Sequence, residues 1–304
     1  MEKQAVPTAV TEEEEHIFDS AFYRKVSRLK LAITQKSTLE FQGRRRTALK
    51  GSSAEFSDFR EYLPGDDVRR IDWNVYARLD KPYVREYMEE RESSVNIFLD
   101  MSASMAFWGK ELLAKQLAGA LALAALSHQD RVGLNIVSGE KTQQLRLSGG
   151  KGNVKRALLA LEEVKAAGSG DLAAAVRGAA YLPRGMTILL SDFCEESFLA
   201  EAQRLCRYLQ CRGQEVVLMQ ISASEERRVT GSGTFRLEDS EGVFDAVRLS
   251  LDRQTVEAYE KEYAAFLEEV GRVSEENGSR YYLCRTEDGF DRILLEQMKN
   301  IMKI

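Results

Sequence analysis

The chain contains few cysteines and histidines, and this scarcity excludes disulfide-rich and zinc-binding proteins. Among its 304 residues there are four cysteines and two histidines. The cysteines form no Cys-x-x-Cys pair, and His16 and His128 are too few to complete a zinc site. The sequence therefore predicts reduced, structural thiols and no zinc-bound domain.

Long apolar runs and an excess of positive charge are also missing. The most apolar stretch, from Leu112 to Ser127, is interrupted by Lys115 and is too short to cross a bilayer, so we expect a buried helix and no membrane span. The acidic N-terminus lacks the basic and apolar segments of a secretory signal, which favours a cytoplasmic location. A net charge of -5 argues against nonspecific nucleic-acid binding, and no nucleic-acid partner is expected.

Two nucleotide-binding motifs are not found. The chain has no Gly-x-x-x-x-Gly-Lys-Ser/Thr sequence, and the nearest approach, at 148–156, has the wrong spacing and reads as the start of a helix. Any ATPase activity would therefore belong to a partner. No Gly-x-Gly-x-x-Gly turn follows the first strand of the main domain, so a dinucleotide-binding domain is the least favoured reading.

The composition divides the chain into three parts. Residues 1–18 form an acidic segment with little apolar content, for which we expect a disordered tail. Residues 19–93 form an N-terminal segment rich in arginine, carboxylates and aromatics, which we expect to pack on the main domain. Residues 94–304 alternate strand and helix patterns, with turn signals near 230–250 that indicate a hairpin insertion.

This alternation predicts an α/β domain with a mainly parallel sheet covered on both faces. The expected strands are 94–100, 132–138, 142–148, 186–192, 215–221 and 280–284. The expected helices are about 106–128, 153–164, 172–181, 197–212, 252–277 and 290–304.

Oxygen-bearing side chains follow two of these strands. Asp100 ends the first strand and is followed by Ser102 and Ser104, and Ser191 and Asp192 end the fourth. Because the carboxyl ends of parallel strands meet at one edge of a sheet, we expect these groups to lie close together. They can form a simple turn by bonding the local backbone and cap the helix that follows or, with the loop 167–172, form a site for a hard cation. For Ser191, a bond to the local backbone is the favoured role.

The pattern Asp-x-Ser-x-Ser, followed by a second strand that ends in Ser-Asp, resembles the metal-ion-dependent adhesion site of von Willebrand factor A domains. The resemblance implies a von Willebrand factor A-like, doubly wound fold. It also implies Mg²⁺, or Mn²⁺, held by Asp100, Ser102, Ser104 and Asp192, with one position open to an acidic residue of a partner protein. That family usually has a threonine where this chain has Gly170, and Ser169 or Asp171 would have to replace it.

The segment before the first strand resembles a second, more selective signature, that of domain-of-unknown-function-58 proteins. The resemblance runs from about Gly51 to the end of the chain. It implies an adaptor that works with a MoxR-type AAA+ ATPase, or with its client, in chaperone-like assembly or maturation. For the charges of 55–91 we favour a structural clamp over a catalytic cluster. The matching residues are Glu55, Phe56, Arg60, Tyr62, Pro64, Gly65, Asp66, Arg69, Ile71, Asp72, Trp73, Ala77, Arg78, Glu90 and Arg91.

Two functions thus remain open for the strand-end residues. The favoured one is a non-catalytic, Mg²⁺-dependent protein-interaction module. The alternative is a metal-dependent hydrolase or phosphatase with Asp100 as nucleophile, but such an enzyme needs a second carboxylate two positions later, where Ser102 stands. A Ser-His-Asp hydrolase is weaker still, because His16 lies in the acidic tail and His128 follows a core helix, where a capping or surface role is expected.

Overall fold

The computed structural model describes residues 16–26, 54–64, 66–89, 94–139, 141–179, 182–195, 198–229, 233–240, 242, 245–298 and 301. The chain divides into two compact units: residues 39–92 form the small unit, and residues 1–38 together with 93–304 form the large unit. Residues 1–15 of the predicted tail and residues 27–53 lie outside the described part.

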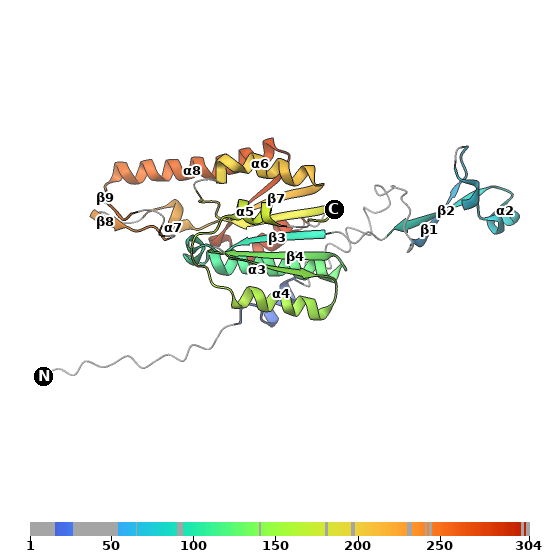
Figure 1. The fold of residues 1–304 in the computed structure, drawn as a ribbon, viewed down its shortest axis with the longest axis horizontal. Helices are drawn as coiled ribbons and strands as arrows, with labels where there is room; N and C mark the ends of the chain where they lie inside the picture. Colours follow the sequence, from blue (N-terminus) through green and yellow to red (C-terminus); the bar gives the residue numbers. More distant parts are fainter. Residues whose placement is uncertain are drawn as a thin grey trace. The chain divides into compact units, whose positions relative to one another are not determined.

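A six-stranded sheet forms the centre of the large unit (Figure 1). The strand order is β10-β7-β6-β3-β4-β5, and all neighbours are parallel except β4 and β5. Counted along the chain from β3, this order is 3-2-1-4-5-6, which confirms the doubly wound, von Willebrand factor A-like fold predicted from the sequence. The strands are β3 (Ser94–Asp100), β4 (Arg131–Ser138), β5 (Lys141–Leu147), β6 (Gly185–Ser191), β7 (Gln214–Ser222) and β10 (Arg280–Arg285).

Both faces of the sheet are buried, and this explains the nearly continuous apolar runs in its central strands. In β3, Ile97 and Leu99 join the hydrophobic core on one face, whereas Phe98 joins the core on the other. Because a strand's side chains alternate between faces, a strand covered on both sides needs apolar residues at successive positions. The pattern read from the sequence as buried strands has this origin.

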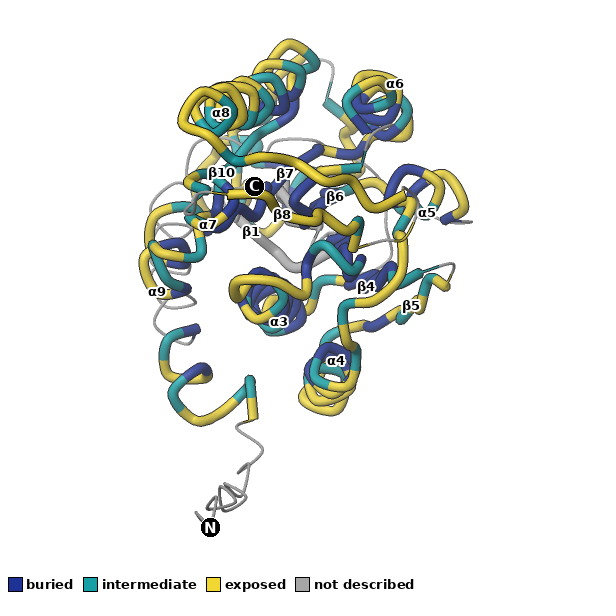
Figure 2. The backbone as a smooth tube through the Cα atoms, turned by 90° about the vertical axis from the view of Figure 1, so that its left-hand side faces the viewer, coloured by how far each residue is buried: buried dark blue, intermediate teal, exposed yellow. Residues whose placement is uncertain are grey.

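Helices cover the two faces in separate layers (Figure 2). One layer contains α3 (Lys110–Ser127), α4 (Lys151–Glu163) and α9 (Gly289–Ile293), which a π-helical turn (Leu294–Met298) continues. The opposite layer contains α5 (Leu172–Gly178), α6 (Phe198–Cys211) and α8 (Arg253–Glu276). No helix in the described part of the chain is both long enough and apolar enough to cross a membrane.

Residues 16–26 pack on the first of these layers. Residues 20–26 are helical, and Phe22 is buried with its ring stacked 5.5 Å from Phe290. His16 Nδ1 lies 2.8 Å from a Glu162 carboxylate oxygen, and Phe18 packs beside Gly119 of α3. Residues 16–18 therefore differ from the disordered tail predicted for 1–18, because Phe18 and the following helix have an apolar surface to cover.

Two antiparallel pairs complete the described elements. β8 (Gly233–Leu237) pairs with β9 (Val247–Leu251) in the region predicted as a hairpin insertion. In the small unit, β1 (Ala54–Glu61) pairs with β2 (Tyr83–Glu89), and α2 (Trp73–Leu79) lies between them in sequence. Within this unit Arg60 donates to Asp66 at 2.8 Å, and Asp72 caps α2, so these two family-signature carboxylates support local structure.

Candidate functional site

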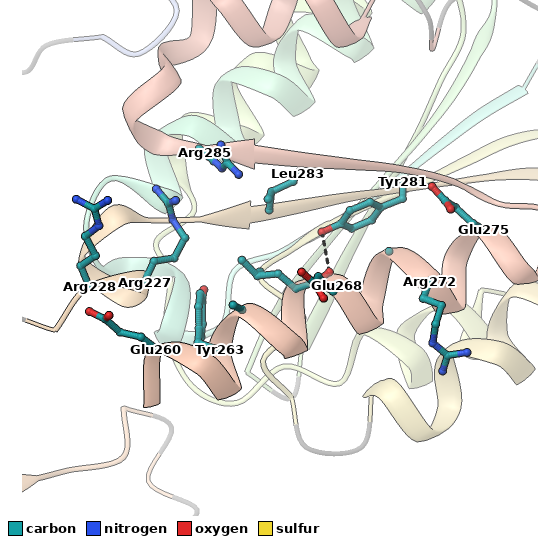
Figure 3. A pocket seen from close by; sticks show the side chains of 13 residues that line it. Arg227, Arg228, Glu260, Tyr263, Glu268, Arg272, Glu275, Tyr281, Leu283 and Arg285 are labelled. Carbon is teal, nitrogen blue, oxygen red and sulfur yellow. Dashed lines mark hydrogen bonds between the residues drawn. The ribbon is translucent and has the colours of Figure 1, made fainter. Parts of the chain in front are cut away.

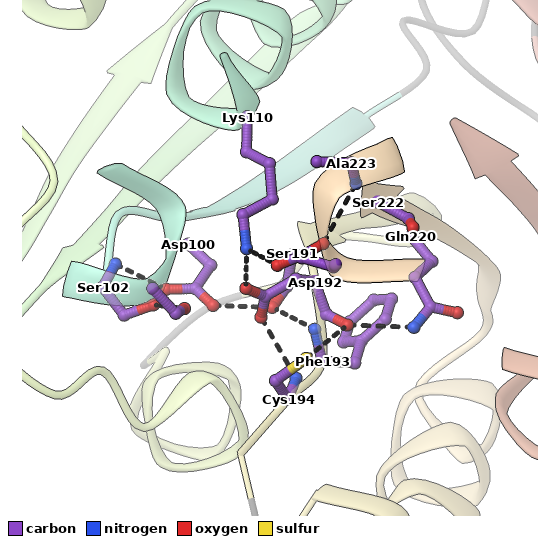
Figure 4. Close-up of polar contacts among 12 residues, drawn as sticks. Asp100, Ser102, Lys110, Ser191, Asp192, Phe193, Cys194, Gln220, Ser222 and Ala223 are labelled. Atoms are coloured by element: carbon purple, nitrogen blue, oxygen red, sulfur yellow. Dashed lines mark hydrogen bonds and ion pairs between the residues drawn. The ribbon is translucent and has the colours of Figure 1, made fainter. Parts of the chain in front are cut away.

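The carboxyl ends of β3, β6 and β7 bring together a buried cluster of charged and hydroxyl side chains (Figure 4). Asp100 ends β3, Asp192 follows β6, and Glu226 lies in α7 (Ser224–Arg227) directly after β7. All three carboxylates are buried. The convergence of Asp100 and Asp192, predicted from strand order, arises because β3 and β6 are adjacent and parallel.

The Asp100 carboxylate is held by two hydrogen bonds. Its Oδ1 accepts the Ser102 backbone N–H at 2.9 Å, and its Oδ2 accepts the Ser191 hydroxyl at 2.6 Å. Ser191 Oγ also accepts the Phe193 backbone N–H at 2.8 Å, which is the local role predicted for it. These contacts, together with a hydrogen bond from the Ser102 hydroxyl, fix the orientation of Asp100.

The Ser102 hydroxyl lies beside this carboxylate, and the Ser104 hydroxyl forms a hydrogen bond with the Ser102 hydroxyl. The two Oγ atoms lie 3.0 Å apart, and Ser102 is buried. Two neighbouring oxygen ligands of an octahedral Mg²⁺, each about 2.1 Å from the ion, lie about 3.0 Å apart, so this spacing suits a shared cation. The alternative role as cap of the long helix is wrong, because α3 begins at Lys110 and Gly109 is its N-cap residue.

A buried lysine neutralises the other side of the cluster. Lys110 is 1% exposed, and its Nζ donates to Asp192 Oδ2 at 2.8 Å and also to Glu226 Oε1. Although burial lowers the pKa of Lys110, the charges of Asp192 and Glu226 raise it above its ordinary value, so the ammonium stays protonated. Two carboxylates thus contact one ammonium, and with Asp100 the cluster has a net charge of -2 when all three carboxylates are ionised.

The excess negative charge of the cluster affects the protonation of Asp100. Burial, and then the negative charge of Asp192, raise its pKa from 3.8 to about 7, although the hydrogen bonds from Ser191 and Ser102 act in the opposite direction. A positive charge beside Asp100 would offset the effects of burial and of the Asp192 charge and would lower this pKa. The charge deficit matches that of one divalent cation.

In the loop 167–172, the position that lacks the hydroxyl faces the cluster, whereas Ser169 and Asp171, the expected replacements, are exposed. Gly170 faces the cluster, since a Cβ built on it would lie 3.2 Å from Asp100 Oδ1 and 3.6 Å from Ser102 Cβ. Asp171 is exposed and caps α5, where its Oδ1 accepts the Ala174 backbone N–H at 2.6 Å. Its assignment as a metal ligand stays a prediction, and the loop presents hydrogen, not a hydroxyl, where Gly170 faces Asp100.

Most of the side-chain oxygens available to a hard cation in the cluster belong to hydroxyls and not to carboxylates. Within the described residues, no group of three or more His, Cys, Asp or Glu side chains is arranged to hold a metal ion. Asp100, Ser102 and Ser104 nevertheless supply three oxygen donors, which suits Mg²⁺ because that ion commonly keeps several waters. Asp192 is already engaged by Lys110 and by the Cys194 backbone N–H.

Lys110 and Glu226 were missed in the sequence reasoning. A signal for Glu226 was present, because the strand-end rule that selected Asp100 and Asp192 applies equally to the residues after the strand 215–221. Lys110 gave no such signal, since a lysine at the start of a helix is usually exposed. Their contact joins residues 116 positions apart in the chain.

An apolar surface adjoins the cluster on the segment before α3 and on the first turn of that helix. Phe107, Trp108 and Leu112 are each about half exposed, and the rings of Phe107 and Trp108 lie 5.5 Å apart. Trp108 has a φ of 52°, a left-handed conformation that is uncommon for a bulky residue. Backbone strain of this kind is concentrated at functional sites.

A groove lies between α8, α7 and β10 (Figure 3). Its volume is about 710 Å³, and Arg227, Arg228 and Arg285 lie together at one end. Tyr263 lines it and donates its hydroxyl to Glu226 at 3.0 Å, so the groove borders the buried cluster.

Several solved structures resemble the chain at low sequence identity. A von Willebrand factor type A protein from Catenulispora acidiphila is 15% identical, with 83% of this chain and 51% of that chain covered and a TM-score of 0.44. The conserved hypothetical protein BatB from Bacteroides thetaiotaomicron is 17% identical, with 70% and 100% covered and a TM-score of 0.42.

Sequence comparison gives a more specific result. Uncharacterized proteins of Mycobacterium bovis and Mycobacterium tuberculosis are each 28% identical to the chain over 270 residues, which covers 85% of this chain and 83% of theirs. The family model described as "Protein of unknown function DUF58" matches residues 58–268, well over half of the chain. The chain therefore belongs to the DUF58 family.

Proposed function

We propose that the chain is a non-catalytic protein-interaction module that binds an acidic residue of a partner through a Mg²⁺ ion at the carboxyl edge of the sheet. The observation that carries the proposal is the buried charge imbalance at Asp100, beside two hydroxyls spaced as neighbouring cation ligands. Asp100, Ser102 and Ser104 would hold the ion. Bound Mg²⁺ would supply a positive charge with exchangeable coordination positions.

The chain's own residues prepare this site for a partner. The hydrogen bonds from Ser102 and Ser191 hold Asp100 in place, and Ser102 and Ser104 add oxygens without adding charge. Neutral ligands leave a cation electrophilic enough to attract an external carboxylate. The adjoining surface of Phe107 and Trp108 would bury apolar groups of the same partner, as aromatic residues commonly do at interfaces.

The partner class follows from the resemblance in the family-signature segment. We infer a MoxR-type AAA+ ATPase or one of its clients, with the chain acting as an adaptor in chaperone-like assembly or maturation. An acidic surface residue of the ATPase or client would occupy the site. Because the chain has no phosphate-binding Gly-x-x-x-x-Gly-Lys-Ser/Thr sequence, nucleotide hydrolysis would be the partner's task.

Calorimetric titration of Mg²⁺ and Mn²⁺ into the full chain tests the metal site. Wild-type protein should bind one ion, and Asp100→Asn should not. Asp252→Asn is the matched control, because Asp252 also accepts a backbone N–H, from Thr255, but caps α8 outside the cluster. Equal binding by wild type and Asp100→Asn, or no binding by wild type, would contradict the proposed site.

A second experiment tests the interaction. A purified MoxR-type ATPase should be captured by wild-type protein in Mg²⁺ and lost in excess chelator or with Asp100→Asn. Capture that is unaffected by both changes would overturn the metal-dependent mode. Metal-dependent turnover of a phosphate ester by wild type, lost in Asp100→Asn, would favour a hydrolase or phosphatase instead.

A further inference from the structure

Lys110 is an unusual residue for the first position of a helix, because its charged end is buried inside the molecule. Its side chain extends from α3 to carboxylates that follow two different strands (Figure 4). The ammonium lies 2.8 Å from Asp192 Oδ2 and also donates to Glu226. Removing one member of such a buried pair leaves the other charge uncompensated, so Lys110 influences every charge in the cluster.

Glu226 is fixed independently of the lysine. Its Oε2 accepts the Ala223 backbone N–H at 3.0 Å and the Tyr263 hydroxyl at 3.0 Å, which leaves Oε1 facing Lys110. One anchor of the ammonium is therefore held by α7 and α8. The lysine is thereby kept within reach of Asp192.

Asp192 is the residue that Lys110 and a divalent cation would share. Its Oδ1 accepts the Cys194 backbone N–H at 3.1 Å, and its Oδ2 accepts from Lys110. In this arrangement the charge of Asp192 is already neutralised. A cation beside Asp100 would gain little from Asp192 and would be repelled by the ammonium, an effect that is large in a poorly solvated cluster.

We propose that Lys110 is a positioning residue that competes with a divalent cation for Asp192 and thereby lowers the cation affinity of the Asp100–Ser102–Ser104 site. This inference rests on the proposed function. It also predicts an effect that the proposed function alone does not predict: removing the lysine should increase the affinity for the cation. If Lys110 only ties α3 to the ends of β6 and β7, its removal should lower stability and leave the affinity unchanged or weaker.

The experiment is calorimetric titration of Mn²⁺ into the full chain and its Lys110→Met variant. Lys115→Met is the matched control, because Lys115 is also buried on α3 but binds Glu111, at 2.7 Å, and the Val164 carbonyl oxygen. Lys110→Met should bind Mn²⁺ at least tenfold more tightly than wild type, and Lys115→Met should stay within about twofold of it. Both changes remove one buried positive charge from the same helix, so a general charge effect would shift them alike.

Two further variants separate the possible outcomes. Glu226→Gln leaves the ammonium with Asp192 as its charged partner and should weaken Mn²⁺ binding severalfold, opposite to Lys110→Met. If Lys110→Met does not fold, Lys110→Met combined with Glu226→Gln releases Asp192 with fewer uncompensated charges and should show the same gain. In either background, Asp100→Asn should abolish the added affinity.

The failures of the two proposals differ. Binding by wild type with no gain, or with a loss, in folded Lys110→Met or in the double variant would overturn the role of Lys110 alone. Equal gains in Lys110→Met and Lys115→Met would also overturn it. An absence of Mn²⁺ binding in wild type and in all variants would overturn the proposed function and this inference together. Binding seen only after Lys110 is replaced, and lost with Asp100→Asn, would support the competition but contradict cation binding by the wild-type protein.

Discussion

Replacing Asp100 by asparagine should stabilise the metal-free protein at neutral and alkaline pH. Asparagine has the same shape, so its carbonyl oxygen can accept the Ser102 N–H and its amide can donate to Ser191 Oγ, preserving both contacts. The change removes the charge that burial and Asp192 disfavour. A substitution at the centre of a binding site is thus expected to increase the free energy of unfolding.

The magnitude follows from the pKa of Asp100. Its value rises from 3.8 to about 7 on folding. The folded state therefore binds more protons than the unfolded state between these values, and wild-type stability falls as the pH rises through this window. A difference of about 3 in pKa corresponds to about 4 kcal/mol at pH 8, where Asp100 is ionised in both states. About 2.5 kcal/mol of this should develop between pH 5 and pH 8.

Urea denaturation followed by circular dichroism, with chelator present, measures the effect. The advantage of Asp100→Asn over wild type should grow by about 2.5 kcal/mol from pH 5 to pH 8, and other titrating groups cancel in the comparison. Asp252→Asn provides a control of opposite sign, because the hydrogen bond from Thr255 lowers the pKa of Asp252 and its charged form is stabilising at pH 8. An Asp100→Asn variant that is no more stable than wild type at pH 8 would refute the reasoning.

Three further changes test the site and the fold. Gly170→Thr adds a hydroxyl beside Asp100 and should strengthen Mn²⁺ binding roughly fivefold by calorimetry, since one added polar contact contributes about 1 kcal/mol. Trp108→Asn should raise the urea midpoint, because asparagine tolerates the left-handed conformation and relief of the strain is worth about 1 kcal/mol. Gly185→Ala should lower the melting temperature sharply, because its Cβ would lie 2.0 Å from the Ser94 carbonyl oxygen and would cost about 3 kcal/mol.

Each of these changes has a control within the chain. Gly170→Ala fills the same space without a hydroxyl and should not strengthen Mn²⁺ binding. Phe193→Asn also relieves a positive φ, but Phe193 is buried and stacks on Phe198, so this variant should lose about 3 kcal/mol or more. Gly152→Ala lies on exposed α4 with open space around it and should be slightly stabilising. Equal effects within any pair would contradict the stated cause.

The sheet could be predicted closely from the sequence because burial on both faces produces a local pattern. The expected strand 94–100 has the same bounds as β3, and the strand 186–192 differs from β6 by one residue at each end. The start of α3 was predicted too early, at about 106. Residues 103–106 form a separate 3-10 turn, and the positive φ values of Trp108 and Gly109 delay the helix to Lys110.

The candidate site was only partly predictable, because some of its residues follow a local pattern in the sequence and others do not. Asp100 ends β3 and Asp192 directly follows β6, so their proximity follows from the parallel pairing of these two strands. The burial of Lys110 depends on carboxylates 82 and 116 residues further along the chain, and no local pattern encodes that distance. From sequence alone, a charged residue at the start of a helix is predicted to be exposed. Lys110 is buried because α3 packs beside the ends of β6 and β7.

The cost of the Asp100 charge is itself an argument for a cation. Asparagine could keep both observed hydrogen bonds, and Ser191 and Ser102 already satisfy the group's geometric role. Folding therefore requires the shape of this side chain but not its charge. The pKa of the buried Asp100 carboxylate is strongly raised, and the neighbouring Asp192 is already paired with Lys110. The negative charge of Asp100 therefore stabilises the protein only when a positive group other than the described side chains binds beside it. Addition of Mg²⁺ at pH 8 should accordingly raise the melting temperature of wild type and leave that of Asp100→Asn unchanged, and an equal rise in both would remove this reason for the charge.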